Sequence, residues 1–276
     1  MFNIFNSPFM QNALLACIFS SIICGIIGIV ITEKKLVMMS GGIAHTAYGG
    51  VGLGYFLGFE PMIGAILFSI ASAFSIGFIQ KKSKLNADMI IGLLWSFGMA
   101  LGILFFTMTT GYKASLESYL FGNVLSVLRS DIITIACLSL FVLLTFIIFK
   151  EDWKSYLFDE QFAWLKGQNT MFFQYFMLIL IALSIVALIH VVGIILVIAM
   201  LTAPAASAGL LSKRFGMRMV FAVMIGFINC MIGLYISYYL NIATGACIVV
   251  VSILTYFILF IIKNSKRKFE RKQKIT

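Results

Sequence analysis

The residue best suited to chemistry in this sequence is His45. It lies in an apolar, glycine-rich segment, residues 39–58, that reads MSGGIAHTAYGGVGLGYFLG. The only other histidine is His190. An imidazole can bind a metal ion or carry a proton, and ionisable groups at bilayer depth are costly and tend to face a protein interior or a wet cavity. We interpret His45 as a candidate ligand on an ion or substrate pathway. The structural alternative is a core histidine bonded to a backbone carbonyl.

The composition predicts that this histidine lies inside a membrane. The chain is 62% hydrophobic and 11% charged, with three prolines in 276 residues. A spanning helix needs about 20 apolar residues. We therefore expect an all-α, polytopic membrane protein with about nine transmembrane helices and no appended soluble domain. The expected spans are 10–32, 36–58, 61–80, 88–109, 131–149, 170–189, 192–209, 219–239 and 245–262. A weaker segment, 114–128, is expected to be re-entrant or interfacial.

Charge placement predicts the orientation of these spans. With the N-terminus outside, the inside loops and tail contain every lysine and arginine except Lys113 and Arg129. This asymmetry follows the positive-inside rule and places the C-terminus in the cytosol. The basic tail, residues 263–276, is interpreted as an anchor on anionic lipid, and we expect no nucleic-acid binding. The first residues, MFNIFNSPFMQN, lack a basic signal region, so the first span is expected to be retained.

Small residues predict which helices pack closely. Gly50, Gly54 and Gly58 are spaced four residues apart, and Gly98 and Gly102 repeat that spacing. Small residues on one helical face let helix backbones approach in lipid. The adjacent pair at 41 and 42 is different, because neighbouring glycines favour a broken helix. We therefore expect an unwound stretch one turn before His45, a feature that transporters use to bind ions.

Several catalytic and nucleotide-binding motifs are missing from the sequence. There is no GxxxxGK[ST] loop, no HExxH and no GxSxG. The chain therefore cannot bind ATP in the P-loop manner, and an intramembrane enzyme is disfavoured. Any uphill transport must take its energy from a partner or from an ion gradient.

Four segments together resemble the membrane permease subunits of bacterial ABC importers for zinc, manganese and related divalent metals. They are SGGIAHTAYGGVGLGYFLG, NADMIIGLLWSFGMALG (residues 86–102), FDEQFAWLKG (158–167) and VVGIILVIAMLTAPAASAGLLSKRF (191–215). They occur in the family's order and span most of the chain. The sequence departs from the family at Gly41, where an aspartate is usual, and at Asn241 and Ala243, where aspartate and proline are usual.

The resemblance implies a single permease domain, residues 1–276, in the bacterial cytoplasmic membrane. It implies a divalent metal ion as cargo, with His45 as the pathway ligand and His190 as a weaker candidate for a gate or ligand. No cofactor is expected to be bound permanently. Imidazole suits zinc, whereas carboxylate favours manganese, so Gly41 shifts the expectation toward zinc.

The resemblance also implies partners. These are cytosolic ABC ATPase subunits, an extracytoplasmic metal-binding protein, a second permease copy or close relative, and membrane lipid. We expect the chain itself not to be an enzyme. The expected ATPase-docking surface is a short helix around Pro204, Ala205 and Ala206 that continues through Lys213 and Arg214 to Arg218, assisted by Phe158–Gly167. Proline is expected to break the seventh span there.

The alternative function is a secondary transporter or channel for a cation that works without an ATPase. Against it, no inverted repeat is evident and there is a single deep histidine to couple ion movement. A neighbouring gene for an ATPase would distinguish the two.

Accessibility of single cysteines tests the predicted orientation. With the native cysteines removed, cysteines introduced at Ser212 and Ser265 should resist impermeant thiol reagents applied to intact cells, because both positions are predicted to be cytosolic. Permeabilising the cells should restore labelling. Ready labelling of intact cells would contradict the nine-span topology.

Overall fold

Nine long helices and two short ones make up the chain that the computed structural model describes, which covers residues 8–82, 87–109 and 127–273. The long helices are α1 (Pro8–Glu33), α2 (Val37–Leu57), α3 (Pro61–Lys82), α4 (Ala87–Met108), α6 (Arg129–Ile148), α9 (Thr170–Val192), α10 (Ile194–Leu211), α11 (Phe215–Leu240) and α12 (Thr244–Gln273). The short ones are α7 (Lys150–Phe158) and α8 (Glu160–Leu165). Within these ranges there is no strand, and the predicted all-α class is confirmed.

All nine predicted spans correspond to long helices. Eight of them, in the described part of the chain, are long and apolar enough to cross a membrane. The remaining one is α2, which contains six glycines, His45 and several other polar residues. A less apolar helix is tolerated here because α2 packs against α3, α4 and α9 and is buried by protein over most of its length.

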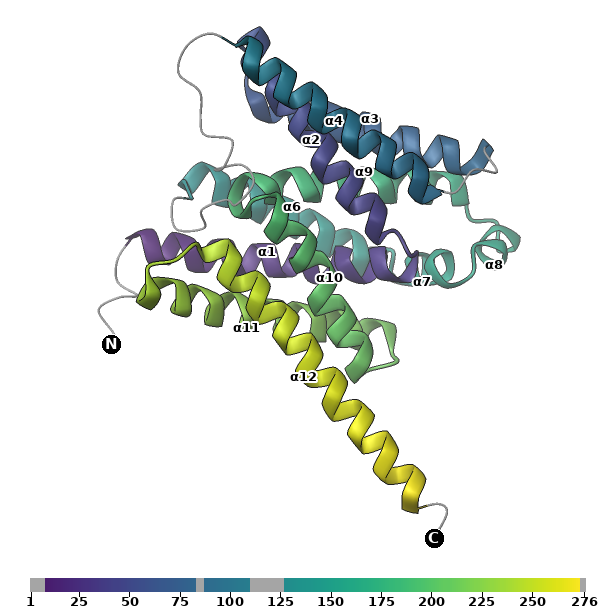
Figure 1. Cartoon of the computed structure of the whole chain (residues 1–276). Helices are drawn as coiled ribbons and strands as arrows, with labels where there is room; N and C mark the ends of the chain where they lie inside the picture. The colour runs from purple at the N-terminus through teal and green to yellow at the C-terminus, as the bar shows by residue number, and fades with distance from the viewer. Residues whose placement is uncertain (1–7, 83–86, 110–126, 274–276) are drawn as a thin grey trace.

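The long helices form two groups that are joined in the middle of the molecule (Figure 1). In one group α2 packs against both α3 and α4, and in the other α1 packs with α10 and α11, and α12 packs with α10 and α11. Helix α9 contacts members of both groups, and α6 packs on α1 and α9. Helix α12 extends beyond the bundle toward the C-terminus (Figure 1).

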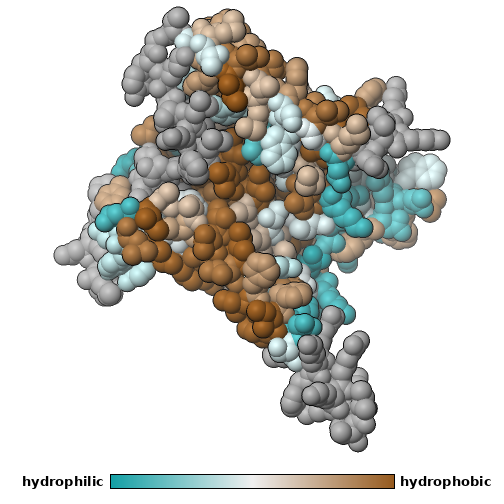
Figure 2. Space-filling view, in the orientation of Figure 1, coloured by the Kyte–Doolittle hydropathy of each residue, from teal (hydrophilic) through white to brown (hydrophobic). Residues whose placement is uncertain are grey.

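Contacts between residues at or near helix ends show that alternate helix ends meet on the same side. Lys34 pairs with Glu160 of α8 at 3.5 Å, Arg218 pairs with Glu33, and the Lys263 amino group donates to the Leu210 carbonyl. We call this side the basic end. Figure 2 shows hydrophilic residues gathered where α7 and α8 lie, beside an extensive apolar surface. The antiparallel alternation of the helices is the one that the charge pattern predicts.

Two predicted helix breaks are wrong. Helix α2 runs without interruption through Gly41 and Gly42, and α10 runs through Pro204. At Gly42 a side chain would collide with Ile91 of α4, so this glycine provides space for a neighbouring helix rather than a break. Pro204 is buried against its neighbours, and packing keeps α10 straight enough to remain one element.

Two other predictions fall at the limits of the described chain. The predicted basic tail begins at residue 263, and α12 continues from there to Gln273. Most of the predicted re-entrant segment, 114–128, lies outside the described residues.

Glycine contacts hold α2 between its two neighbours. On one side, a Cβ at Gly49 would lie 2.7 Å from the Gly98 carbonyl oxygen, and one at Gly52 would lie 2.6 Å from that of Gly102. On the other side, Gly50 faces the backbone of Gly64 in α3. The predicted packing role of these spaced glycines is confirmed. Gly58 is the exception, since it ends α2 in the left-handed conformation with φ of 75°.

The glycine contact between α2 and α4 can be tested with two substitutions in α4. In Gly98→Ala the new methyl group would lie 2.6 Å from Thr46 Cα, so we expect a loss of stability of about 1–3 kcal/mol. Gly92→Ala is the matched control, because a Cβ there meets nothing within 4 Å. Thermal stability of the purified protein in detergent should fall for Gly98→Ala alone. Equal stability of the two variants would contradict the close contact.

Candidate functional site

His45 is the one partly exposed residue in a long buried stretch of α2. All the residues from Met39 to Gly52 except His45 are buried. Its position in the helix places it roughly 12 Å from the start of α2 and 18 Å from the end. The imidazole is therefore at mid-depth, on the face of α2 that packs against α4. This is the placement expected of a group that contacts a solute crossing the membrane.

The ring of His45 is held by Trp95 of α4. The two rings stack with centroids 4.1 Å apart and an interplanar angle of 12°. Nδ1 of His45 is buried and has no hydrogen-bond partner within the described chain. The alternative of a core histidine satisfied by a backbone carbonyl is therefore not supported at Nδ1. The sequence analysis did not identify this contact, because Trp95 is 50 residues away from His45 in the chain.

Gly41 lies one turn before His45 and leaves space on the same side of α2. A Cβ at this position would lie 3.5 Å from Trp95 and 3.9 Å from Ile198 of α10, which are ordinary contact distances. The space that a short side chain would occupy is thus present, but glycine supplies no oxygen ligand. The Thr46 hydroxyl does not supply the missing oxygen ligand either, because it donates a hydrogen bond to the Gly42 carbonyl at 2.7 Å.

Other metal-binding side chains are not gathered around His45. Within the described chain, no group of three or more His, Cys, Asp and Glu side chains is placed to hold a metal ion. A single imidazole binds a cation weakly compared with the three or four ligands of a permanent site. Any cation at His45 must take its remaining ligands from water, backbone or another chain, which fits transient passage better than storage.

His190 is separate from His45 and lies at the opposite end of the bundle. Its Nε2 is 3.5 Å from Oδ1 of Asp131 in α6, and its side chain is 38% exposed. Asp131 also accepts a hydrogen bond from the Leu128 backbone N–H at 3.1 Å, which caps α6. A small cavity beside His190 is lined by Glu60 and Val51 among others. Val51 of α2, which lines this cavity, is six residues or about 9 Å along the helix from His45, so the two histidines do not share a site.

Two short helices at the basic end were not predicted as helices. In α7, Trp153, Tyr156 and Leu157 are buried. Trp153 stacks on Phe146 of α6 with centroids 4.7 Å apart. The i, i+3, i+4 spacing of these three buried residues is a helix signal that the sequence analysis did not use. In α8, Asp159 caps the helix by accepting a hydrogen bond from the Phe162 N–H at 2.9 Å.

Helix α8 is tied to the start of α2 through Lys34. The Lys34 ammonium group is 3.5 Å from Glu160 and 3.9 Å from the centre of the Tyr156 ring. Burial lowers the pKa of Lys34, and the Glu160 carboxylate partly offsets that effect. Burial also raises the pKa of Tyr156 above its usual range. Only three residues separate α1 from α2, and Lys35 there has φ of 58°, so the linker is tightly constrained.

Some of the residues predicted to dock the ATPase are buried, and others are exposed. Pro204 and Ala205 are buried within α10, so they cannot form an exposed docking helix. The predicted short helix between Pro204 and Arg218 is wrong, because α10 ends at Leu211 and α11 begins at Phe215. Lys213 and Arg214 are exposed in the intervening loop. That loop lies beside α7, since the rings of Phe158 and Phe215 are 5.6 Å apart.

Asn241, one of the residues at which the sequence departs from the family, lies at the end of α11. Asn241 ends α11 with φ of 53° and ψ of 44°. Asparagine tolerates this left-handed conformation better than most residues. Its presence is therefore consistent with a helix cap.

A buried, less apolar helix at the centre of a bundle of spanning helices, with a polar group at mid-depth, defines a multi-pass membrane permease. Residues 6–263 match the ABC 3 transport family. The chain belongs to that family.

The chain is similar to several relatives and to a solved structure over nearly its whole length. It is 37% identical over 255 residues to the manganese transport system membrane protein MntC of Listeria monocytogenes, covering 92% of this chain and 90% of the relative. It is 32% identical over 268 residues to the chelated iron transport system membrane protein YfeD of Yersinia pestis, covering 97% and 90%. The structure of PsaBC from Streptococcus pneumoniae in complex with Fab matches with a TM-score of 0.87 at 32% identity, covering 99% of this chain and 100% of that one.

Proposed function

We propose that this chain is the permease subunit of an ABC importer that moves a divalent transition-metal ion, manganese or zinc, across the bacterial cytoplasmic membrane. The proposal is supported by its membership in the ABC 3 transport family and by relatives named for manganese and chelated-iron transport. The observation that carries it is His45, a partly exposed imidazole at mid-depth whose Nδ1 is free of hydrogen bonds in the described chain.

In this proposal His45 is a ligand that the metal ion meets during passage. The stacked Trp95 ring restricts rotation of the imidazole, so that a ring nitrogen is presented in a fixed direction. A neutral imidazole suits zinc and other borderline cations, and manganese accepts it together with oxygen ligands. A second permease copy or a close relative supplies the facing wall of the pathway. An extracytoplasmic binding protein delivers the ion at the end that carries His190.

The ATPase subunits are proposed to dock at α8 and the adjoining loop of Lys213 and Arg214. Helix α8 lies beyond the spanning helices, yet Phe162, Trp164 and Leu165 are 47%, 68% and 75% exposed. Large apolar side chains exposed together outside the bilayer are typical of a protein-interaction surface. This modifies the expected surface, which included the now buried Pro204 and Ala205, and retains its Phe158–Gly167 part.

A physical connection from this docking surface to the pathway supports the proposal. Movement of α8 would act on Glu160 and then on Lys34, which is three residues before the first residue of α2. Helix α2 carries His45, and the glycine contacts make it move together with α3 and α4. Alternating access could therefore be driven by displacement of α2 as part of a rigid group.

Substitution of Trp164 tests the docking surface. Trp164→Glu should prevent co-purification with the cognate ATPase and ATP-driven uptake, because a charge would replace the most exposed ring of α8. Membrane insertion should be unchanged. Leu240→Glu, which adds the same charge to a residue 63% exposed at the opposite end, should keep the ATPase bound. Retention of the ATPase by Trp164→Glu would show that docking occurs elsewhere.

Substitution of His45 tests the pathway. His45→Ala should lower uptake of radioactive manganese or zinc by at least about tenfold in cells that express the complete transporter. His45→Asp, which supplies a hard oxygen ligand, should retain partial uptake with the preference shifted toward manganese. Wild-type uptake should fall as acidification protonates the imidazole, since a protonated ring cannot bind a metal.

The matched control for His45 is Leu53→Ala, which truncates another partly exposed side chain of α2 without removing a ligand. It should keep near-normal uptake. Normal uptake by His45→Ala at normal membrane expression would show that His45 is not on the pathway. Equal loss in both variants would point to a packing defect in α2.

A further inference from the structure

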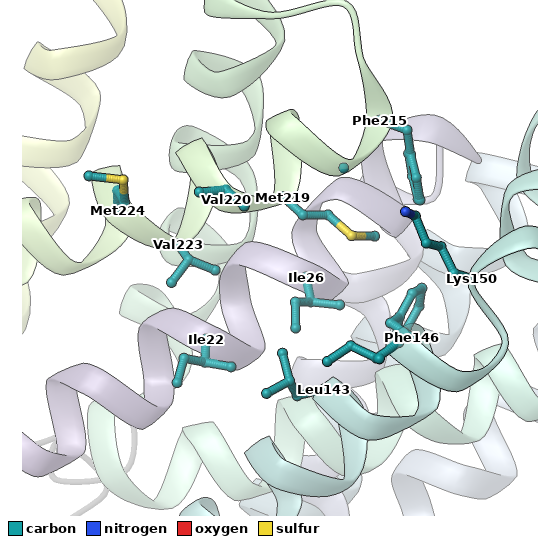
Figure 3. A pocket seen from close by; sticks show the side chains of 12 residues that line it. Ile22, Ile26, Leu143, Phe146, Lys150, Phe215, Met219, Val220, Val223 and Met224 are labelled. Atoms are coloured by element: carbon teal, nitrogen blue, oxygen red, sulfur yellow. The ribbon is translucent and has the colours of Figure 1, made fainter.

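A groove of about 540 Å³ lies between α6 and α11 near the basic end (Figure 3). Helix α1 forms its floor, because α6 and α11 each pack against α1. The lining is apolar apart from one amino group, that of Lys150. The residues that line it are Ile22, Ile26, Leu143, Phe146, Ile147, Lys150, Phe215, Gly216, Met219, Val220, Val223 and Met224.

The groove is closed at its floor and open along its rim. Ile26 and Phe146 are 4% and 6% exposed, whereas Ile147 and Met224 on the facing walls are 61% and 54% exposed. Both walls belong to helices that are long and apolar enough to cross a membrane, so the open side lies at the depth of the bilayer. A Cβ added to Gly216 would meet nothing within 4 Å, which means that the groove has unfilled space at that point.

Positive charge at the end of the groove lacks an acidic partner. Lys34, Lys154 and Arg218 at the basic end each pair with a glutamate. By contrast, no carboxylate of the described chain lies within 4.0 Å of Lys150, Lys213 or Arg214. Figure 3 shows the Lys150 amino group turned toward Phe215, the first residue of α11. The residue before it, Arg214, provides no side-chain cap for this helix.

We propose that this groove binds an anionic phospholipid of the adjacent leaflet, with one acyl chain between α6 and α11 and the phosphate at Lys150. The apolar walls bury the chain, and the volume lies within the range of about 300–1,000 Å³ that is usual for ligand pockets. Basic pockets between transmembrane helices on the cytoplasmic side recognise anionic head groups in this way. The acyl chain would fill the groove between α6 and α11. The inference does not depend on the identity of the transported ion.

Photolabelling tests the lipid site directly. The full-length chain is reconstituted in phosphatidylcholine vesicles that contain either phosphatidylglycerol or phosphatidylcholine with a diazirine on one acyl chain, and the labelled peptides are mapped. We expect labelling within residues 143–150 and 215–224 to be about fivefold stronger with phosphatidylglycerol, the ratio expected from one lysine near an anionic group. Lys150→Gln should remove that preference while labelling persists.

Filling the groove should prevent occupancy. Gly216→Phe should lower labelling several-fold, because the ring enters the open space, and Val220→Trp provides a second filling variant if the first is not monodisperse. Gly92→Phe is the matched control, since Gly92 also has open space at its Cβ but lies on α4 away from the groove. Labelling of the groove peptides in the Gly92→Phe variant should be as strong as in the wild type.

Two results would overturn the proposal. Equal labelling by both lipids that is unaffected by either filling variant would mean contact with bulk lipid only. Absence of labelling, together with a disulfide between copies that carry cysteine at Ile147 and at Val220, would mean that a second copy of this chain covers the groove.

Discussion

The backbone-to-backbone packing of α2 against α3 and α4 is the constraint on which the rest of the structure depends. Gly49 and Gly52 face the carbonyl groups of Gly98 and Gly102, while Gly50 faces Gly64 on the other side. In lipid there is little hydrophobic force to bring helices together, so close contact through small residues must provide the attraction. Because protein covers both sides of α2, this helix can carry polar residues that lipid would exclude.

The same packing determines where His45 is presented. Gly49 and Gly52 lie on the same helical face of α2 as His45, so the imidazole is on the side that faces α4, where Trp95 stacks on its ring. The residue at position 41 leaves room but no ligand. A pathway built from one imidazole per chain would bind a cation weakly enough to release it, and release is as necessary for transport as binding is.

In the proposed importer, the basic end would connect the pathway at His45 to the docking surface at α8. Trp153 and Tyr156 fix α7 against the bundle, and Glu160 of α8 contacts Lys34. Because only three residues separate α1 from α2, a displacement of α8 in the proposed mechanism would act on both helices through Lys34. The groove between α6 and α11 lies beside this region.

The sequence by itself determined the helical class, the nine long segments, their alternation and the glycine faces. These depend on local composition and on periodic spacing, and both can be read along the chain. It also identified His45 from its rarity at that depth. It did not predict that α2 is continuous at Gly41 and Gly42 or that Pro204 lies within a helix, because neighbouring helices override those local signals. Only the tertiary structure brought Trp95 to His45, Glu160 to Lys34 and Asp131 to His190, since each pair joins residues that are far apart in the chain and the spacing within one helix contains no record of them.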